Sequence, residues 1–219
     1  MTKTQMEIFK ELSESIINGD SHKALKAAEK IVEAGVDPLM AVEEGISSGA
    51  EKIGQMFERD EIYLPELLLA AEAIEAALKV LEPKIMEKYK GEKKRGCIVI
   101  GTVQGDIHDL GKNIVTLLLA ANGYNVVDLG RDVPAMKFIE EAEKNNADII
   151  GLSALMTTTK DQQREVIKML EDLGLRDRYK VIVGGGVASE EWKNQIGADG
   201  YAKNAVEALA LIDNILKEG

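Results

Sequence analysis

The sequence predicts an α+α/β fold, in which an N-terminal four-helix bundle precedes a flavodoxin-like (Rossmann-type) domain with a five-stranded parallel sheet. Three observations predict it. Apolar residues recur at helical spacing over roughly the first 90 residues. Beyond them, short apolar runs alternate with amphipathic segments, which indicates strands alternating with helices. Aromatic residues make up only 4% of the 219 residues, which favours helices and buried parallel strands over a β-sandwich.

Four helices are expected in the N-terminal part. The first ends at Asn18-Gly19-Asp20, and the second ends at Gly35. Asp37-Pro38 has the form of an N-cap followed by proline at the first helical position, and it opens a third helix that extends to Met56. The fourth helix opens at Leu64-Pro65. Its expected apolar stripe consists of Leu67, Leu68, Ala71, Ile74, Leu78 and Leu81. Because the connections are short, the helices are expected to pack as an antiparallel bundle.

The polar run from Lys90 to Arg95 is the expected linker. It divides the chain into a helical domain of residues 1–91 and an α/β domain of residues 92–219. The charge changes at the same place, since residues 1–92 carry a net charge of −8 and residues 93–219 a net charge of −3.

Five strands are expected after the linker, at residues 97–103, 124–129, 148–153, 180–183 and, more weakly, 199–202. Helices are expected near 109–122, 135–145, 160–173, 189–196 and 204–217. In doubly wound sheets the ligand lies beyond the carboxyl ends of the strands, at a topological switch point. Functional residues are therefore expected on the loops that follow the strands.

Composition excludes several classes of function. The net charge of −11 disfavours non-specific binding to nucleic acid, which needs a cationic surface. A single cysteine, Cys97, points to a reducing compartment. The N-terminus lacks the apolar segment of a secretory signal, and no apolar run is long enough to span a membrane. A cytoplasmic protein is expected.

The segment from Gly101 to Asn113 follows the first expected strand and enters the first helix of the α/β domain. It is neither a Walker A loop nor a G-x-G-x-x-G loop. It contains Asp106-x-His108, in which His108 can bind a metal through one ring nitrogen while Asp106 accepts a hydrogen bond from the other. The alternative is that His108 only caps the helix or hydrogen-bonds the loop.

Two further segments follow strands on the same rim. Ser153-Ala154-Leu155 precedes a run of hydroxyls, Thr157 to Thr159, and Gly184-Gly185-Gly186 follows the fourth strand. Glycines at this rim leave room for a bulky ligand against the backbone, although each is also compatible with an ordinary turn.

Together these segments resemble the cobalamin-binding signature of B12-dependent methyltransferases and mutases. The matching blocks are Asp106-x-His108-x-x-Gly111, then after 41 residues Ser153-x-Leu155, then after 28 residues Gly184-Gly185. The N-terminal helices also resemble the helical cap of methyltransferase corrinoid proteins, including the segment from Phe57 to Pro65. The resemblance covers nearly the whole chain and is strongest to the methylamine type among the carriers of methylamine, methanol and betaine systems.

The resemblance implies a cobalamin or related corrinoid as cofactor and a role for each matching residue. His108 would be the lower axial ligand of cobalt and Asp106 its hydrogen-bond partner. Related proteins place a hydroxyl where this chain has Thr159, which implies a relay His108–Asp106–Thr159. Ser153 and Leu155 would line the slot for the displaced nucleotide tail, with space made by Gly184 and Gly185. The remaining candidate contacts to the cofactor are Gln104, Gly105, Asp109, Gly111, Thr157 and Thr158.

The resemblance further implies a carrier subunit of a multi-component system, not catalytic alone. It would accept a methyl group onto Co(I) from a substrate-specific methyltransferase and pass it to a second methyltransferase with a thiol or tetrahydrofolate acceptor. A reductive activase would be a further partner, and nucleic acid and membrane would not be partners. The helical domain would cover the methyl group and move aside for each partner.

Other functions stay open. They are O-demethylation of methoxylated aromatics, a B12-dependent regulator lacking its DNA-binding part, and a mutase subunit, which would not need the helical domain. A metal-dependent hydrolase using Asp106, His108 and Asp109 would lack further ligands, because the chain has only two histidines.

The sequence also indicates positions for a few residues outside the motifs. His22 is expected at the surface or in a cap, and Cys97 in the core. A group in the helical domain is interpreted as bundle core, with the alternative that some members cover the cobalt. The group consists of Met56, Tyr63, Leu64 and Leu67.

Overall fold

The computed structural model describes residues 3–91 and 96–218. Its contacts divide the chain into two compact units after residue 88. The expected boundary after residue 91 stays a prediction, because residues 92–95 of the expected linker lie outside the described residues. Within the described part, no helix is both long and apolar enough to cross a membrane.

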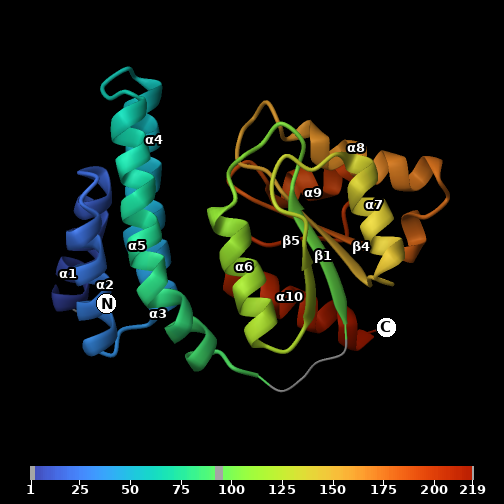
Figure 1. The fold of residues 1–219 in the computed structure, drawn as a ribbon. Coiled ribbons are helices and arrows are strands. Elements are labelled where there is room, and N and C mark those ends of the chain that lie inside the picture. The colour runs from blue at the N-terminus through green and yellow to red at the C-terminus, as the bar shows by residue number, and fades with distance from the viewer. Residues whose placement is uncertain (1–2, 92–95, 219) are drawn as a thin grey trace. The chain divides into compact units, whose positions relative to one another are not determined.

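The first unit consists of helices alone (Figure 1). Its elements are α1 (Lys3–Ile17), α2 (Ser21–Glu33), α3 (Pro38–Ala41), a π-helical segment η1 (Val42–Ser47), α4 (Ser48–Glu58) and α5 (Leu64–Lys88). Asp37 caps α3 by accepting a hydrogen bond from the Leu39 amide, as expected for Asp-Pro at a helix start. The backbone stays in the right-handed helical region through both ends of η1, so α3, η1 and α4 form the single third helix that was predicted.

Alanines form most of the buried face of α5, and the apolar stripe predicted for this helix is partly wrong, since Leu81 is buried and Leu67, Ile74 and Leu78 are half-buried. The buried residues are Ala70, Ala73, Ala77, Leu81 and Ile85, whereas Leu68 and Ala71 are exposed. The helix is apolar on more than one side, so periodicity could not select the face. Tertiary packing selects the small residues, which allow close approach to α2, itself lined by buried Ala24, Ala27 and Ala28.

Part of the bundle-core interpretation is also wrong. Tyr63 and Leu64 are 69% and 58% exposed, and Met56 and Leu67 are only half-buried. The reason is their position, because these residues lie where α4 ends and α5 begins, beyond the packed part of the bundle. His22 is exposed in the first turn of α2, as predicted.

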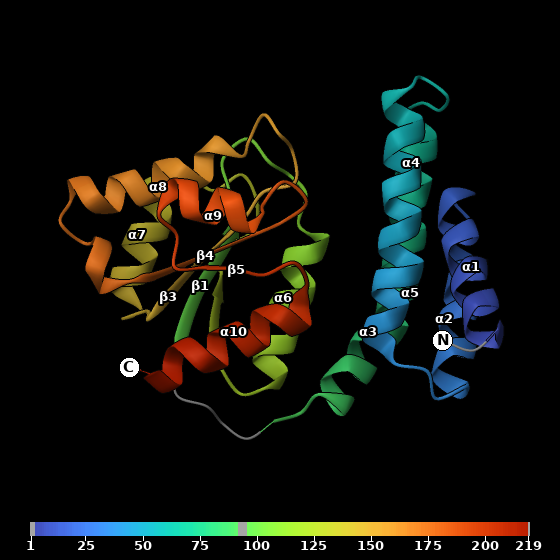
Figure 2. The ribbon, with the colours of Figure 1, turned by 180° about the vertical axis from the view of Figure 1, so that it is seen from behind.

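The second unit is a three-layer α/β domain (Figure 2). Its elements are β1 (Cys97–Thr102), α6 (Leu110–Ala121), β2 (Asn125–Asp128), α7 (Ala135–Lys144), β3 (Ile149–Ser153), α8 (Asp161–Asp172), a 3₁₀ turn η2 (Arg176–Arg178), β4 (Lys180–Gly184), α9 (Glu190–Ile196), β5 (Gly200–Tyr201) and α10 (Ala205–Glu218). These elements confirm the predicted alternation of strands and helices, with ends that differ by at most one residue.

All strand pairs are parallel, and the order is β2-β1-β3-β4-β5. This is the flavodoxin-like order, which confirms the predicted fold class. One face of the sheet packs against α6 and α10 through residues such as Leu119 and Ile212, and the other packs against α7, α8 and α9 through Phe138, Leu170 and Trp192. Cys97 is buried at the start of β1, as predicted.

The strand order reverses at β1, so the helices that follow β1 and β3 lie on opposite faces of the sheet. Thr102 at the end of β1 lies in register with Ser153 at the end of β3. The loops after these two strands are therefore neighbours at the switch point, which is where ligands bind in such sheets.

Candidate functional site

The carboxylate of Asp106 joins the two loops at the switch point. Its Oδ1 accepts hydrogen bonds from the backbone amide of His108 at 3.0 Å and from His108 Nδ1 at 2.8 Å. Its Oδ2 accepts hydrogen bonds from the loop after β3. The donors are Leu155 N at 2.8 Å, Met156 N at 3.2 Å and Thr159 Oγ1 at 2.7 Å. Asp106 has no exposed surface, and Thr159 is also buried.

The charge of this buried carboxylate is stabilised by its donors. Burial by itself raises the pKa of Asp106, but hydrogen bonds from Thr159, Leu155 and His108 outweigh it, and the pKa lies well below its usual range. Asp106 is therefore an anion at neutral pH and accepts from all five donors.

The same arrangement selects the tautomer of His108. Because the Asp106 carboxylate accepts at Nδ1, the neutral imidazole carries its proton on this nitrogen and has its lone pair on Nε2. The His108 side chain is 46% exposed, in contrast to its partner. The geometry therefore supplies one oriented nitrogen ligand, backed by a carboxylate, at the carboxyl end of the sheet. The structure brings together all three members of the predicted relay.

Hydrogen bonds to the backbone of the loop that carries His108 hold this loop in place. Thr102 Oγ1 donates to the carbonyl oxygen of His108 at 3.2 Å, and the amide of Gly105 donates to Asp132 Oδ1 at 2.7 Å. The amide of Asp132 in turn donates to the carbonyl oxygen of Asp106 at 3.0 Å. Gly105 has φ +81°, a conformation that favours glycine.

The other predicted residues lie on the same rim but have different environments. Gln104, Thr157 and Thr158 are exposed, whereas Ser153 is half-buried at the end of β3. Leu155 is an exposed large apolar residue, as is Ile107, which had not been singled out. Asp109 precedes α6 without a side-chain cap, and a side chain at Gly111 would meet open space. Accessible hydroxyls, an amide and apolar groups thus lie on the same two loops as His108 and its partners.

Gly185 has a steric role that the sequence did not indicate. It has φ +97°, and a Cβ atom there would lie 2.0 Å from the carbonyl oxygen of Ala154. The backbones after β3 and β4 therefore approach too closely for any side chain. At Gly184 a Cβ would be 3.4 Å from the Ala202 carbonyl, so this glycine is less constrained.

Two buried polar residues beside the site were missed. Gln163 in α8 has no exposed surface, and Lys112 in α6 is 3% exposed. Lys112 Nζ donates to both oxygens of Asp128 at 2.7 and 2.6 Å and to Asn113 Oδ1 at 2.6 Å. A signal existed for Gln163, because it lies at helical spacing from the buried Val166 and Ile167 and is thus a polar residue on an apolar stripe.

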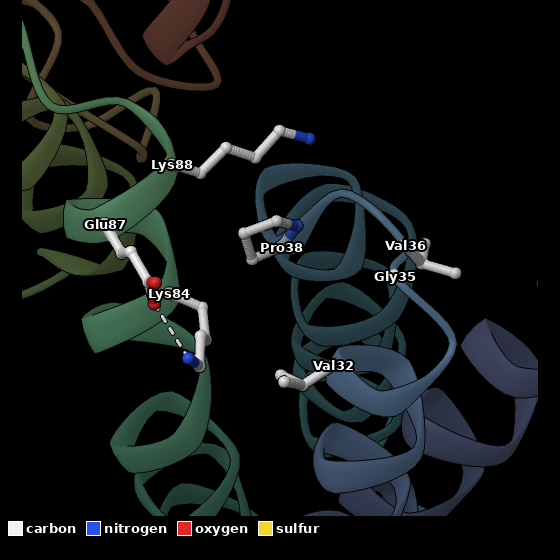
Figure 3. A pocket seen from close by; sticks show the side chains of 7 residues that line it. All are labelled: Val32, Gly35, Val36, Pro38, Lys84, Glu87 and Lys88. Atoms are coloured by element: carbon white, nitrogen blue, oxygen red, sulfur yellow. Dashed lines mark hydrogen bonds and ion pairs between the residues drawn. The ribbon is translucent and has the colours of Figure 1, made fainter.

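A hollow in the helical unit has a different character (Figure 3). It lies where the end of α2 and the start of α3 meet the end of α5. Its lining residues are Val32, Gly35, Val36, Pro38, Lys84, Glu87 and Lys88. Its cations already have partners, since Lys84 pairs with Glu87 at 2.8 Å and Lys88 with Asp37 at 2.7 Å. The first pair is exposed and the second is partly exposed, so the hollow offers no buried, oriented ligand atom comparable to that of His108.

The donor set at the rim fits a metal that arrives with its own ligands. Among residues 3–91 and 96–218, no group of three or more His, Cys, Asp or Glu is arranged to hold a metal ion. His108 is therefore a single protein ligand, and the exposed apolar and polar groups around it suit a large organic ring. This combination agrees with a metal-containing cofactor and gives no support to a hydrolytic metal site.

Comparisons with known proteins agree with the geometry. Two family models, each described as a B12 binding domain, match residues 96–210 and residues 8–82. The chain is 46% identical to "Dimethylamine corrinoid protein 2" of Methanosarcina mazei, over 97% of this chain and 99% of that protein. It is 40% identical to "Trimethylamine corrinoid protein 1" of Methanosarcina acetivorans, over 96% of this chain and 97% of that protein.

Solved structures show the same likeness. The monomethylamine corrinoid protein of Methanosarcina barkeri is similar with a TM-score of 0.84 at 35% identity, covering 95% of this chain and 98% of that one. A chain of the methanol:cobalamin methyltransferase complex from Methanosarcina barkeri is similar with a TM-score of 0.54 at 30% identity, covering 97% of this chain and 81% of that one.

Proposed function

The chain belongs to the family of corrinoid proteins with B12-binding domains, and from this premise we propose that it carries a methyl group between methyltransferases. The observation that carries the proposal is His108, whose Nδ1 is held by the buried Asp106 so that Nε2 would be the atom that binds cobalt. When bound, the corrinoid supplies a cobalt centre that can accept a methyl group and release it again.

The residues of this chain hold and tune that centre. His108 is the protein ligand, and Asp106 keeps the imidazole in one orientation and raises its basicity. The donors of Thr159, Leu155 and Met156 hold Asp106 in turn. Gln104, Gly105, Asp109, Gly111, Thr157 and Thr158 contact the corrinoid in this proposal. Ser153, Leu155, Gly184 and Gly185 border the space for its nucleotide tail.

A methylamine is the methyl donor that the relatives support best. The proteins with 40–46% identity over nearly the whole chain include corrinoid proteins named for dimethylamine and trimethylamine. A substrate-specific methyltransferase is accordingly the first partner, as in the methanol:cobalamin methyltransferase complex. A second methyltransferase with a thiol or tetrahydrofolate acceptor, and a reductive activase, complete the proposed system in the cytoplasm.

The helical unit is proposed to shield the methyl group that the corrinoid would carry. Support comes from an exposed apolar end of this unit, which consists of Phe57, Tyr63, Leu64 and Leu68. Exposed apolar residues gathered in this way are typical of a contact surface.

The assignment of His108 is tested by spectroscopy of the protein loaded with hydroxocobalamin. We expect the visible spectrum of a corrinoid whose benzimidazole is replaced by histidine. In His108→Ala this spectrum should be lost. His22→Ala is the matched control, because His22 is the only other histidine and is exposed in the helical unit. An unchanged spectrum in His108→Ala would remove His108 as the ligand.

The carrier role is tested by reconstitution with a methyltransferase. The protein loaded with corrinoid in its Co(I) state should gain a methyl group from a methylamine only when the partner methyltransferase is present. Mono-, di- and trimethylamine methyltransferases are compared to identify the donor. Turnover of a free methylamine without any partner would contradict the carrier role.

A further inference from the structure

Gln163 lies in the first turn of α8 and makes three hydrogen bonds while fully buried. Its Nε2 donates to the carbonyl oxygens of Leu152 at 2.9 Å and Gly184 at 3.0 Å. Its Oε1 accepts from Trp192 Nε1 at 2.9 Å. The orientation of the amide is determined by these partners, since carbonyl groups only accept and an indole nitrogen only donates. One side chain thus connects α8 with the carboxyl ends of β3 and β4 and with α9.

A continuous series of turns connects Gln163 to the donors of Asp106. The amide of Thr159 donates to the Met156 carbonyl at 3.1 Å, that of Gln162 to the Thr159 carbonyl at 3.0 Å, and that of Gln163 to the Lys160 carbonyl at 3.1 Å. The position of residues 155–159 therefore follows the position of Gln163. These residues supply three of the five donors to the Asp106 carboxylate.

Trp192, whose indole N–H donates to Gln163, is itself fixed by burial and by two cations. The ring is 5% exposed, with Lys160 Nζ 4.3 Å and the Arg164 guanidinium 4.6 Å from its centroid. Both cations flank Gln163 in sequence, and each is attracted to the aromatic face. The indole N–H is therefore kept where it can hold the Gln163 amide in one orientation.

We propose that Gln163 is a positioning residue for the cofactor site, which acts by fixing the loop 154–159 at the carboxyl ends of β3 and β4. It touches neither His108 nor Asp106. Its effect on them passes through Leu155, Met156 and Thr159. This inference rests on the proposed function for its effect on the corrinoid, but its effect on the loop is independent of any cofactor.

The test uses the full chain with Gln163→Met, which keeps the length of the side chain and removes all three hydrogen bonds. The Gly184 carbonyl retains a donor in the Ala154 amide at 3.2 Å, so it is not left unpaired. Gln162→Met is the matched control, because Gln162 is the half-buried neighbour on the same turn. Two readouts are compared: amide hydrogen exchange of Leu155 and Met156 without cofactor, and affinity for hydroxocobalamin with the spectrum of the bound form.

In Gln163→Met we expect exchange at Leu155 and Met156 to rise about tenfold or more, while amides of β1 and α6 change less. We also expect the affinity for hydroxocobalamin to fall about tenfold and the spectral contribution of bound histidine to decrease. Gln162→Met should change neither readout. Unchanged exchange, or faster exchange with unchanged affinity and spectrum, would overturn the proposal.

Trp192→Phe provides the deciding measurement if Gln163→Met does not fold. It keeps an aromatic ring in the core and removes only the N–H that orients Gln163. The same readouts should move in the same direction by a smaller factor, and their constancy would overturn the proposal. Failure of the wild-type chain to bind any corrinoid would contradict the proposed function instead, and the exchange measurement would still decide the role of Gln163 in the loop.

Discussion

Replacement of Asp106 by asparagine should destabilise the α/β unit although the two side chains have nearly the same shape. The carboxylate accepts two hydrogen bonds at Oδ1 and three at Oδ2. An asparagine amide presents an oxygen on one side only, so its NH₂ group must face at least two N–H donors. In addition, the bonds that remain lose the charge that strengthens them.

The magnitude follows from these contacts. One or two buried donors become unsatisfied, at about 1–3 kcal/mol each, and about three charge-assisted hydrogen bonds become neutral, at roughly 0.5–1 kcal/mol each. Asp106→Asn should therefore lower the free energy of unfolding of the α/β unit by about 2.5–9 kcal/mol at pH 7. This is a large part of the stability of a typical domain.

Urea denaturation of the cofactor-free protein measures this loss. Fluorescence of Trp192 reports on the α/β unit alone, because it is the only tryptophan of the chain and is buried there. Because the pKa of Asp106 is lowered from 3.8, its stabilisation is fully present above the pKa of the unfolded chain and is lost as the pH falls toward the folded pKa. The gap between wild type and variant should thus be constant from about pH 7 to 5 and narrow below about pH 4. A gap under about 1 kcal/mol at pH 7 would refute the reasoning.

Three further predictions concern other parts of the structure. Gly185→Ala should destabilise the α/β unit by several kcal/mol more than Gly174→Ala. Both glycines have positive φ, but only a Cβ at Gly185 would lie 2.0 Å from a backbone atom. Equal midpoints of urea denaturation for the two variants, followed by Trp fluorescence, would contradict this. Lys112→Met should lower the free energy of unfolding by about 2–3 kcal/mol, because it leaves the partly exposed Asp128 carboxylate without its cation. If the difference between wild type and variant disappears in high salt, the pair behaves as a surface ion pair and the expectation is wrong. In the helical unit, Leu68→Gln should change stability by less than about 0.5 kcal/mol and Leu81→Ala should cost about 2–5 kcal/mol, as followed by circular dichroism; a larger loss in Leu68→Gln than in Leu81→Ala would contradict the buried face of α5 described above.

The candidate site was largely predictable because its chemistry is local in sequence. Asp106 and His108 are two residues apart on one loop, and the hydrogen bond between them needs no distant partner. Thr159 was placed beside them by resemblance, and the parallel register of β1 and β3 brings it there. The contacts of Gln163 with Trp192 and with two strand ends were not predictable, because they join residues up to 29 positions apart in different elements.

The sequence by itself determined the order of elements, the parallel sheet and the position of the ligand-binding rim. Hydrophobic periodicity, capping residues and glycines act over a few residues, so they can be interpreted without knowing the fold. Tertiary structure alone decided which face of α5 is buried. Both the alanine and the leucine side of that helix are apolar, and only close packing against the alanines of α2 distinguishes them. It also decided that Asp106 is fully buried as an anion, since the donors that compensate its burial come from two separate loops.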